Sequence, residues 1–186
     1  MTINDASSID EKLRRIADYE RGRRTTVPRM IQSAGRTRAF AAFYRRYGPK
    51  VDPWLFRKTQ GQAGAQLGFP VLLLTTMGAK SGLPRVSPLI YVRDGDDFVV
   101  LGTNFGQRHH PGWTANLRAH ADAVIEVGPE QLPVTAELVD PTTWERLWPR
   151  FVAIHPGYEN YLTRCAPRRP RMYRLRPRPA EFSNSH

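Results

Sequence analysis

The chain has 186 residues, of which 40 % are hydrophobic and 24 % charged, and its formal net charge is +11. These values fit a single globular domain with an appended arm and exclude disordered and fibrous classes. No apolar run approaches the roughly 18 residues of a membrane span, the N-terminus lacks the apolar core of a secretory signal, and the single cysteine excludes a disulfide framework or a cysteine-based zinc cluster. A cytoplasmic location is therefore expected.

The first predicted element is a charged helix over residues 8–24, in which Ser8 caps the first turn and Glu11 completes a capping box. Its apolar stripe is narrow, so it would dock weakly on a domain, on a partner or on a membrane surface. Two further helices are expected over residues 36–47 and 52–60, followed by a glycine-rich link.

From Val71 onward the pattern changes to short strands joined by turn residues. Pro88 lies inside the second strand, which predicts an edge position or a bulge there. We expect strands over 71–76, 85–93, 98–103, 123–128, 132–139 and 171–177, and helices over 111–121, 141–155 and 157–165.

The hairpin connections predict an antiparallel β-barrel or sandwich, and the absence of βαβ alternation disfavours a Rossmann sheet. The predicted fold class is mainly β with flanking helices. We divide the chain into a charged N-terminal helical arm, residues 1–38, and a barrel domain, residues 39–186.

Both ends of the chain are basic. Residues 1–69 carry 14 basic and 6 acidic side chains, whereas residues 70–166 carry 8 and 10. Because most of the cations are arginines, which favour phosphate and carboxylate, the charge suits a polyanionic partner: nucleic acid, an anionic membrane surface or a polyanionic cofactor. A solvated basic surface without a partner explains the charge equally well.

The loop between the first two strands, MGAKSGLPR over residues 77–85, combines two glycines, two cations and a hydroxyl. Glycines let backbone N–H groups approach an anion, and Lys80 and Arg85 would neutralise it. The loop lacks the spacing of a Walker motif and no helix follows it. It is a candidate phosphate site, and the alternative is an ordinary hairpin with exposed charges.

Two later stretches also carry chemistry. The loop over residues 102–113 leads into a helix N-terminus, which favours anions, and its adjacent His109 and His110 are poorly placed to share one metal ion. Tyr158 and Tyr161 lie three residues apart on one helical face. Their hydroxyls could orient or protonate a substrate carbonyl, or the rings could simply pack.

Taken together, LLLTTMGAKSGLPRVSPL, PGWTANL and HPGYENY resemble the deazaflavin-dependent nitroreductase family. The similarity extends from about Tyr44 to about Pro177. It implies a split β-barrel like that of the flavin-binding pyridoxamine-phosphate oxidases, and binding of the reduced deazaflavin coenzyme F-420. It also implies hydride transfer from that coenzyme to a quinone, an enone or a nitro compound.

The resemblance assigns site residues by their position in these motifs. The cofactor-binding candidates are Lys80, Ser81, Gly82, Arg85, Ser87, Pro88, Leu89, Thr103, Asn104, Trp113 and Asn116. The catalytic candidates are Tyr158, Thr103 and Tyr161. No metal is expected.

Two departures from the family pattern matter: the one at Asn104 implies the loss of one coenzyme contact, and the one at His155 disfavours nitroreduction of the prodrug type and points to a different substrate. Asn104 replaces a lysine and His155 replaces a third tyrosine of a relative. Three alternatives stay open: the same barrel binding FMN, a non-catalytic carrier of the coenzyme, a tetrapyrrole or a lipid, and a basic nucleic-acid-binding protein. A lipophilic acceptor, a homodimer and peripheral association with the inner membrane face through the N-terminal helix are compatible with the sequence.

Overall fold

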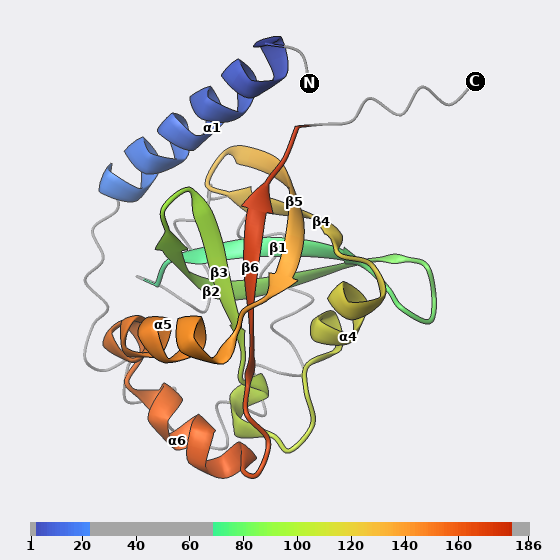
Figure 1. Cartoon of the computed structure of the whole chain (residues 1–186), viewed down its shortest axis with the longest axis vertical. Helices are drawn as coiled ribbons and strands as arrows, with labels where there is room; N and C mark the ends of the chain where they lie inside the picture. Colours follow the sequence, from blue (N-terminus) through green and yellow to red (C-terminus); the bar gives the residue numbers. More distant parts are fainter. Residues whose placement is uncertain (1–2, 23–68, 180–186) are drawn as a thin grey trace.

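A computed structural model describes residues 3–22 and 69–179 of the chain. Its strands form a closed antiparallel barrel in the order β1-β2-β3-β6-β5-β4 (Figure 1). They are β1 (Val71–Met77), β2 (Pro84–Asp94), β3 (Asp97–Gly102), β4 (Asp122–Val127), β5 (Glu130–Leu138) and β6 (Arg171–Pro177). The helical elements are α1 (Ile3–Gly22), the 3-10 turn η1 (Asn104–Gly106), α4 (Gly112–Ala119), α5 (Pro141–Ile154) and α6 (Gly157–Cys165).

The mainly-β fold class predicted from the sequence is confirmed, because the turn residues place the hairpins as expected. Gly95 and Gly128 adopt positive φ angles of 64° and 57° in the β2–β3 and β4–β5 turns. Glycine reaches this backbone region without the steric cost that a Cβ imposes. The predicted helices over residues 36–47 and 52–60, the glycine-rich link and the domain boundary at residue 38 lie outside the described residues.

The strand β2 pairs with a different strand along each part of its length. Residues 84–90 pair with β1, including Pro88 opposite Leu73, whereas β3 pairs only with residues 91–94. Among the described residues, the first half of β2 therefore has a strand on one side only. Proline lacks the N–H of a ladder donor, so it is tolerated at such a place. The edge position predicted from Pro88 agrees with this pairing.

Helix α1 packs on the barrel. Ile16 is fully buried and belongs to the barrel core, with Leu13 and Tyr19 packed against it. Lys12 donates a hydrogen bond to the carbonyl of Gln131 in β5. The apolar stripe of this helix thus packs on the barrel, which is one of the docking surfaces that the sequence left open.

The predicted start of α1 was wrong. The helix begins at Ile3 rather than at Ser8, so Ser8 lies inside it and does not cap its first turn. Residues 3–7 contain no proline or glycine, so nothing interrupts the helix upstream of Ser8.

A second apolar core lies between the barrel and the helices α5 and α6, on the side away from α1 (Figure 1). Asp140 caps α5 by accepting a hydrogen bond from the backbone N–H of Thr143 at 2.9 Å, and Pro141 starts the helix. Trp144, Leu147 and Phe151 face the barrel. No helix within the described ranges is long and apolar enough to cross a membrane.

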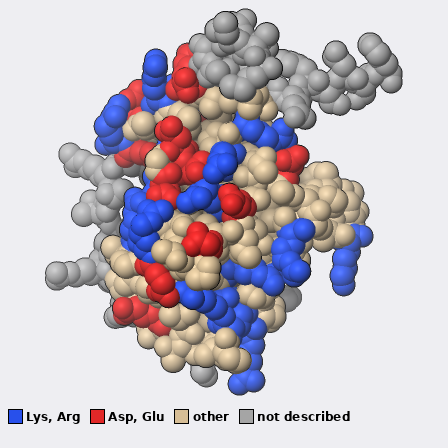
Figure 2. All heavy atoms as spheres, in the orientation of Figure 1, with Lys and Arg blue, Asp and Glu red and all other residues tan. Residues whose placement is uncertain are grey.

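Acidic and basic side chains interleave across the middle of the face seen in Figure 2 rather than forming one basic patch. Asp94 at the end of β2 pairs with Arg146 at 2.8 Å and with Arg174 at 3.0 Å. Arg174 also lies 3.4 Å from Asp97. Part of the arginine excess on this side is therefore used in ion pairs within the protein.

Candidate active site

A cavity of about 870 Å³ opens beside residues 84–90 of β2, which pair with β1 alone among the described strands. Its lining includes every site residue predicted from the sequence except Gly82. These residues are Lys80, Ser81, Arg85, Ser87, Pro88, Leu89, Thr103, Asn104, Trp113, Asn116, Tyr158 and Tyr161. Gly82 lies beside Ser81 in the turn between β1 and β2. Its φ angle is 63°, and its N–H donates to the carbonyl of Gly78.

One end of the cavity is formed by the β1–β2 turn, residues 78–83. Lys80, Ser81 and Arg85 are exposed there. Among the described residues, neither Lys80 nor Arg85 forms an ion pair, so both cations are available to an anionic ligand. The turn is compact: a Cβ on Gly78 would lie 2.6 Å from Ser81 Oγ and 3.0 Å from the carbonyl of Leu83. Only glycine fits at this position.

Asn116 on α4 holds this turn in place. Its Oδ1 accepts a hydrogen bond from the N–H of Ala79 at 3.0 Å, and its Nδ2 donates to Thr76 Oγ1 at 2.9 Å. Both ends of the amide are therefore engaged by the protein. The structure thus gives Asn116 a role that the sequence did not suggest, because it positions Thr76 and Ala79, which precede Lys80.

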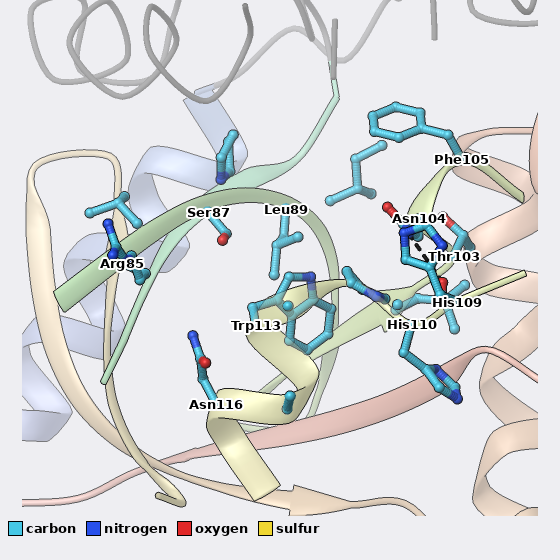
Figure 3. A pocket seen from close by; sticks show the side chains of 18 of the residues that line it. Arg85, Ser87, Leu89, Thr103, Asn104, Phe105, His109, His110, Trp113 and Asn116 are labelled. Carbon is cyan, nitrogen blue, oxygen red and sulfur yellow. Dashed lines mark hydrogen bonds between the residues drawn. The ribbon is translucent and has the colours of Figure 1, made fainter. Parts of the chain in front are cut away.

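The middle of the cavity is apolar. Arg85, Ser87 and Leu89 follow one another along β2, while Trp113 and Asn116 project from α4 toward the same space (Figure 3). Trp113 is almost buried, and its ring packs edge-on against Tyr173 at a centroid distance of 5.8 Å. This surface suits a flat, partly apolar ligand.

The other end of the cavity is formed by the loop that leaves β3, residues 103–110 (Figure 3). Its backbone is unusual, because Asn104 and Phe105 have positive φ angles of 50° and 54°. The Asn104 side chain donates to the carbonyl of His109 at 3.1 Å. Asn104 thus closes the loop through a contact within the protein.

His110 is held as a neutral imidazole at this end. Burial, followed by the nearby Arg171, Arg168 and Arg118, lowers its pKa to about 4. Arg168 lies 3.2 Å from its Nδ1, which therefore acts as the acceptor. No group of three or more histidine, cysteine, aspartate or glutamate side chains gathers into a metal site in the part of the chain that the structure describes.

Four rings from α5, α6 and the start of β1 close the same end. Tyr158 lies 5.0 Å from His155 and 5.9 Å from Tyr161, and His155 lies 5.5 Å from Phe69, measured between ring centroids. Burial raises the pKa of Tyr158 well above its usual range and also raises that of Tyr161. Both phenols therefore stay protonated at neutral pH and can donate a hydrogen bond.

Sequence reasoning missed three residues of this region. Phe69 and Phe105 line the cavity, and Arg168 holds the loop from behind with its guanidinium. No local pattern marks Arg168 among 24 arginines. The two phenylalanines lie beside predicted site segments, so only the fold could assign them to the cavity.

The barrel and the place of its cavity define a protein of the split-barrel class. The chain belongs to the F420H(2)-dependent quinone reductase family, whose model matches residues 49–170. The resemblance found in the sequence is thereby confirmed at the level of the family.

Two curated relatives come from Mycobacterium tuberculosis strain H37Rv. One, named F420H(2)-dependent quinone reductase, is 41% identical over 98 residues, which span 50% of this chain and 66% of the relative, just under two thirds. The other carries the same name provisionally and is 34% identical over 98 residues, covering 53% of this chain and 82% of the relative.

Two solved structures support the fold. An F420-H2 dependent reductase, FDR-A, is 30% identical with a TM-score of 0.53, covering 57% of this chain and 93% of that one. A structure described as a domain-swapped dimer is 26% identical with a TM-score of 0.55, covering 70% of this chain and 98% of that one.

Proposed function

We propose that this protein is a reductase that transfers a hydride from the reduced deazaflavin coenzyme F-420 to a quinone or a related electron-poor acceptor. Family membership supports the reaction class. The observation that carries the proposal is the convergence on one cavity: segments far apart in the sequence bring all the predicted site residues except Gly82 to its walls. Such convergence of polar groups on one large apolar pocket is typical of cofactor and substrate sites.

The residues present fit the coenzyme, which is long, partly flat and anionic at one end. Lys80 and Arg85, which form no ion pair with the described part of the chain, offer two exposed cations to its phosphodiester and acidic tail. The apolar surface of Pro88, Leu89 and Trp113 would hold the flat ring system. When bound, the reduced coenzyme supplies the hydride, and the protein supplies position and electrostatics.

The acceptor would occupy the tyrosine end of the cavity. Hydride transfer builds negative charge on the acceptor oxygen, and a hydrogen-bond donor held beside that oxygen stabilises it. Tyr158 suits this role because its raised pKa keeps the hydroxyl protonated and its burial keeps bulk water away. Thr103 and Tyr161 are further hydroxyl donors on the same walls. Neighbouring aromatic rings favour a lipophilic acceptor over a charged one.

A titration of tryptophan fluorescence with the oxidised deazaflavin coenzyme and with FMN, in parallel, tests cofactor choice. Trp113 lines the cavity and reports occupancy. Saturable quenching by the deazaflavin alone, followed by reoxidation of the reduced coenzyme when a quinone is added, is the expected result. Quenching by FMN alone would move the protein to flavin chemistry on the same fold. Coenzyme binding without turnover of quinones, enones or nitro compounds would make it a carrier.

A homodimer forms part of the proposal, because one of the similar solved structures is described as a domain-swapped dimer. Sedimentation velocity at micromolar protein concentration tests it. A single species of twice the chain mass is expected, and a monomer at every concentration would remove the dimer from the proposal.

A further inference from the structure

Arg168, in the segment between α6 and β6, uses every N–H group of its guanidinium on the loop that leaves β3. Nε donates to the carbonyl of Gln107 at 3.2 Å, and Nη2 donates to the carbonyls of Gln107 and Thr103, both at 2.8 Å. Nη1 donates to the carbonyl of Gly102 at 3.0 Å and to His110 Nδ1 at 3.2 Å. The five donors of the fork therefore have five acceptor contacts.

The loop that receives these bonds requires such support. Asn104 and Phe105 lie in the left-handed backbone region, which is unfavourable for residues with a side chain and persists only where surrounding contacts impose it. Gly106 follows with a φ of 76°, and a Cβ there would lie 3.2 Å from the Cα of Tyr161 on α6. The loop thus packs closely against α6, which carries Tyr158 and Tyr161. Hydrogen bonds from Arg168 hold the loop in this position.

Arg168 is itself fixed to the end of α6. Its backbone N–H donates to the carbonyl of Cys165 at 3.0 Å. In return, the buried Cys165 Sγ donates to the carbonyl of Arg168 at 3.2 Å. The loop, the guanidinium and the tyrosine helix are therefore connected by short contacts, although Arg168 and its acceptors are 58 to 66 residues apart in the sequence.

We infer that Arg168 is a positioning residue for the reaction: it holds the Gly102–Gln107 wall of the cavity against the Tyr158 and Tyr161 helix, and so sets the geometry of the acceptor end without touching either substrate. This inference rests on the proposed function. Arg168 does not line the cavity, so its effect passes through the backbone carbonyls of Gly102, Thr103 and Gln107. The end of the cavity that carries Lys80 and Arg85 is held separately by Asn116 and is therefore independent of Arg168.

Lysine cannot replace this arginine. An ammonium group keeps the charge but offers three donors at one point, whereas the loop presents acceptors around a planar fork. Arg168→Lys therefore removes the geometry and retains the charge. Arg169→Lys is the matched control, because Arg169 is the next residue and points to Glu145 at 2.5 Å and to the ring of Trp144 at 4.0 Å.

Hydrogen–deuterium exchange and steady-state kinetics on the full chain test the inference together. In the native loop, the N–H groups of Gly106 and Gln107 donate to the carbonyls of Thr103 and Asn104, both at 3.0 Å. In Arg168→Lys we expect exchange of the peptide covering residues 103–107 to rise about tenfold, with the β1–β2 turn unchanged. We expect kcat to fall about tenfold while the dissociation constant of the oxidised deazaflavin stays within about threefold. Arg169→Lys is expected to change none of these.

Unchanged exchange in the loop would overturn the inference, as would faster exchange with an unchanged kcat. An equal loss of coenzyme affinity and kcat would also overturn it, since the effect would not be confined to one end of the cavity. If Arg168→Lys does not fold, His110→Ala removes one of the five acceptor contacts and is expected to raise exchange in the same peptide by a smaller factor. A wild-type protein that binds no deazaflavin contradicts the proposed function, and the exchange measurement then decides the role of Arg168 alone.

Discussion

The two ends of the cavity are built in opposite ways. At the β1–β2 turn, exposed cations stand on a short turn that one amide side chain, Asn116, braces. At the other end, buried or half-buried side chains lie on the loop that leaves β3, in which Asn104 and Phe105 have left-handed backbone angles. Arg168 holds this loop by hydrogen bonds to its backbone carbonyls. Exposed side chains can adapt to a long anion, whereas a reacting atom needs walls that do not move. On the proposed function, coenzyme binding and chemistry would therefore be separated along one pocket.

The largest expected effect is the loss of unfolding free energy when a side chain is added at Gly106, in the loop that leaves β3. Gly106 and Gly82 both have positive φ, 76° and 63°, but a Cβ on Gly106 would lie 3.0 Å from Arg164 Cβ and one on Gly82 would meet nothing within 4 Å. The left-handed conformation alone costs a residue with a side chain about 1 kcal/mol, so we expect Gly82→Ala to lose about 1 kcal/mol of unfolding free energy and Gly106→Ala about 3 kcal/mol. Urea unfolding of the pair measures the difference. Equal losses would show that the two ends are equally tolerant.

The second prediction removes the charge from the exposed end. Lys80→Ala combined with Arg85→Ala is expected to weaken binding of the oxidised deazaflavin about 20-fold, because an exposed charged contact contributes about 1 kcal/mol. Fluorescence titration at two salt concentrations measures it. The control, Lys12→Ala with Arg150→Ala, removes the same charge outside the cavity lining. An equal loss of deazaflavin affinity in the control would show that the effect comes from the net charge of the protein and not from these two positions.

The third prediction separates chemistry from binding. Tyr158→Phe is expected to lower kcat about tenfold with coenzyme affinity unchanged, because it removes a protonated hydroxyl and keeps the ring. Tyr173→Phe serves as the control: its hydroxyl donates to the carbonyl of Thr114 at 3.2 Å, outside the cavity lining. Full turnover in Tyr158→Phe would exclude this hydroxyl from the reaction.

The last prediction concerns the stability of the folded protein in acid. The pKa of His110 is about 4 in the folded protein against an ordinary value of 6.5, with burial as the main cause. Between these values the unfolded chain binds a proton that the folded chain does not, so this group makes the folded state less stable as the pH falls from 6.5 to 4. Above pH 6.5 it contributes no pH dependence. Comparison of thermal unfolding of His110→Phe with the wild type across this window measures the contribution, and identical pH dependence would contradict it.

Much of the barrel follows from local sequence. Gly95 and Gly128 mark two hairpin turns, Pro141 marks a helix start, and the near-continuous apolar run from Val71 marks a buried strand, so short-range rules suffice. The start of α1 shows where those rules fail. Ser8 and Glu11 satisfy a capping motif, which predicts that the helix starts at Ser8. Because the segment before Ser8 contains no helix breaker, the helix extends upstream to Ile3 in spite of this motif.

The cavity shows the same division. The motif residues reach it because they lie on strands, turns and short helices whose faces the local pattern fixes. Arg168 cannot be read in this way, because its acceptors lie 58 to 66 residues earlier in the chain and are mostly backbone carbonyls, which carry no residue identity. The sequence places Asn116 at the cofactor site, but it does not indicate that the amide side chain also forms hydrogen bonds with Ala79 and Thr76.

Pro88 also affects whether the edge of β2 can pair with a strand of another chain. Along residues 84–90, β2 presents to one side a row of backbone groups that a foreign strand could join, and such edges are where chains stick together. A proline paired with Leu73 leaves no N–H in the middle of that row, so an incoming strand would lose a bond where it would need one. Among the described residues, Pro88 thus disfavours pairing with another chain along the stretch of β2 that has no strand on its second side.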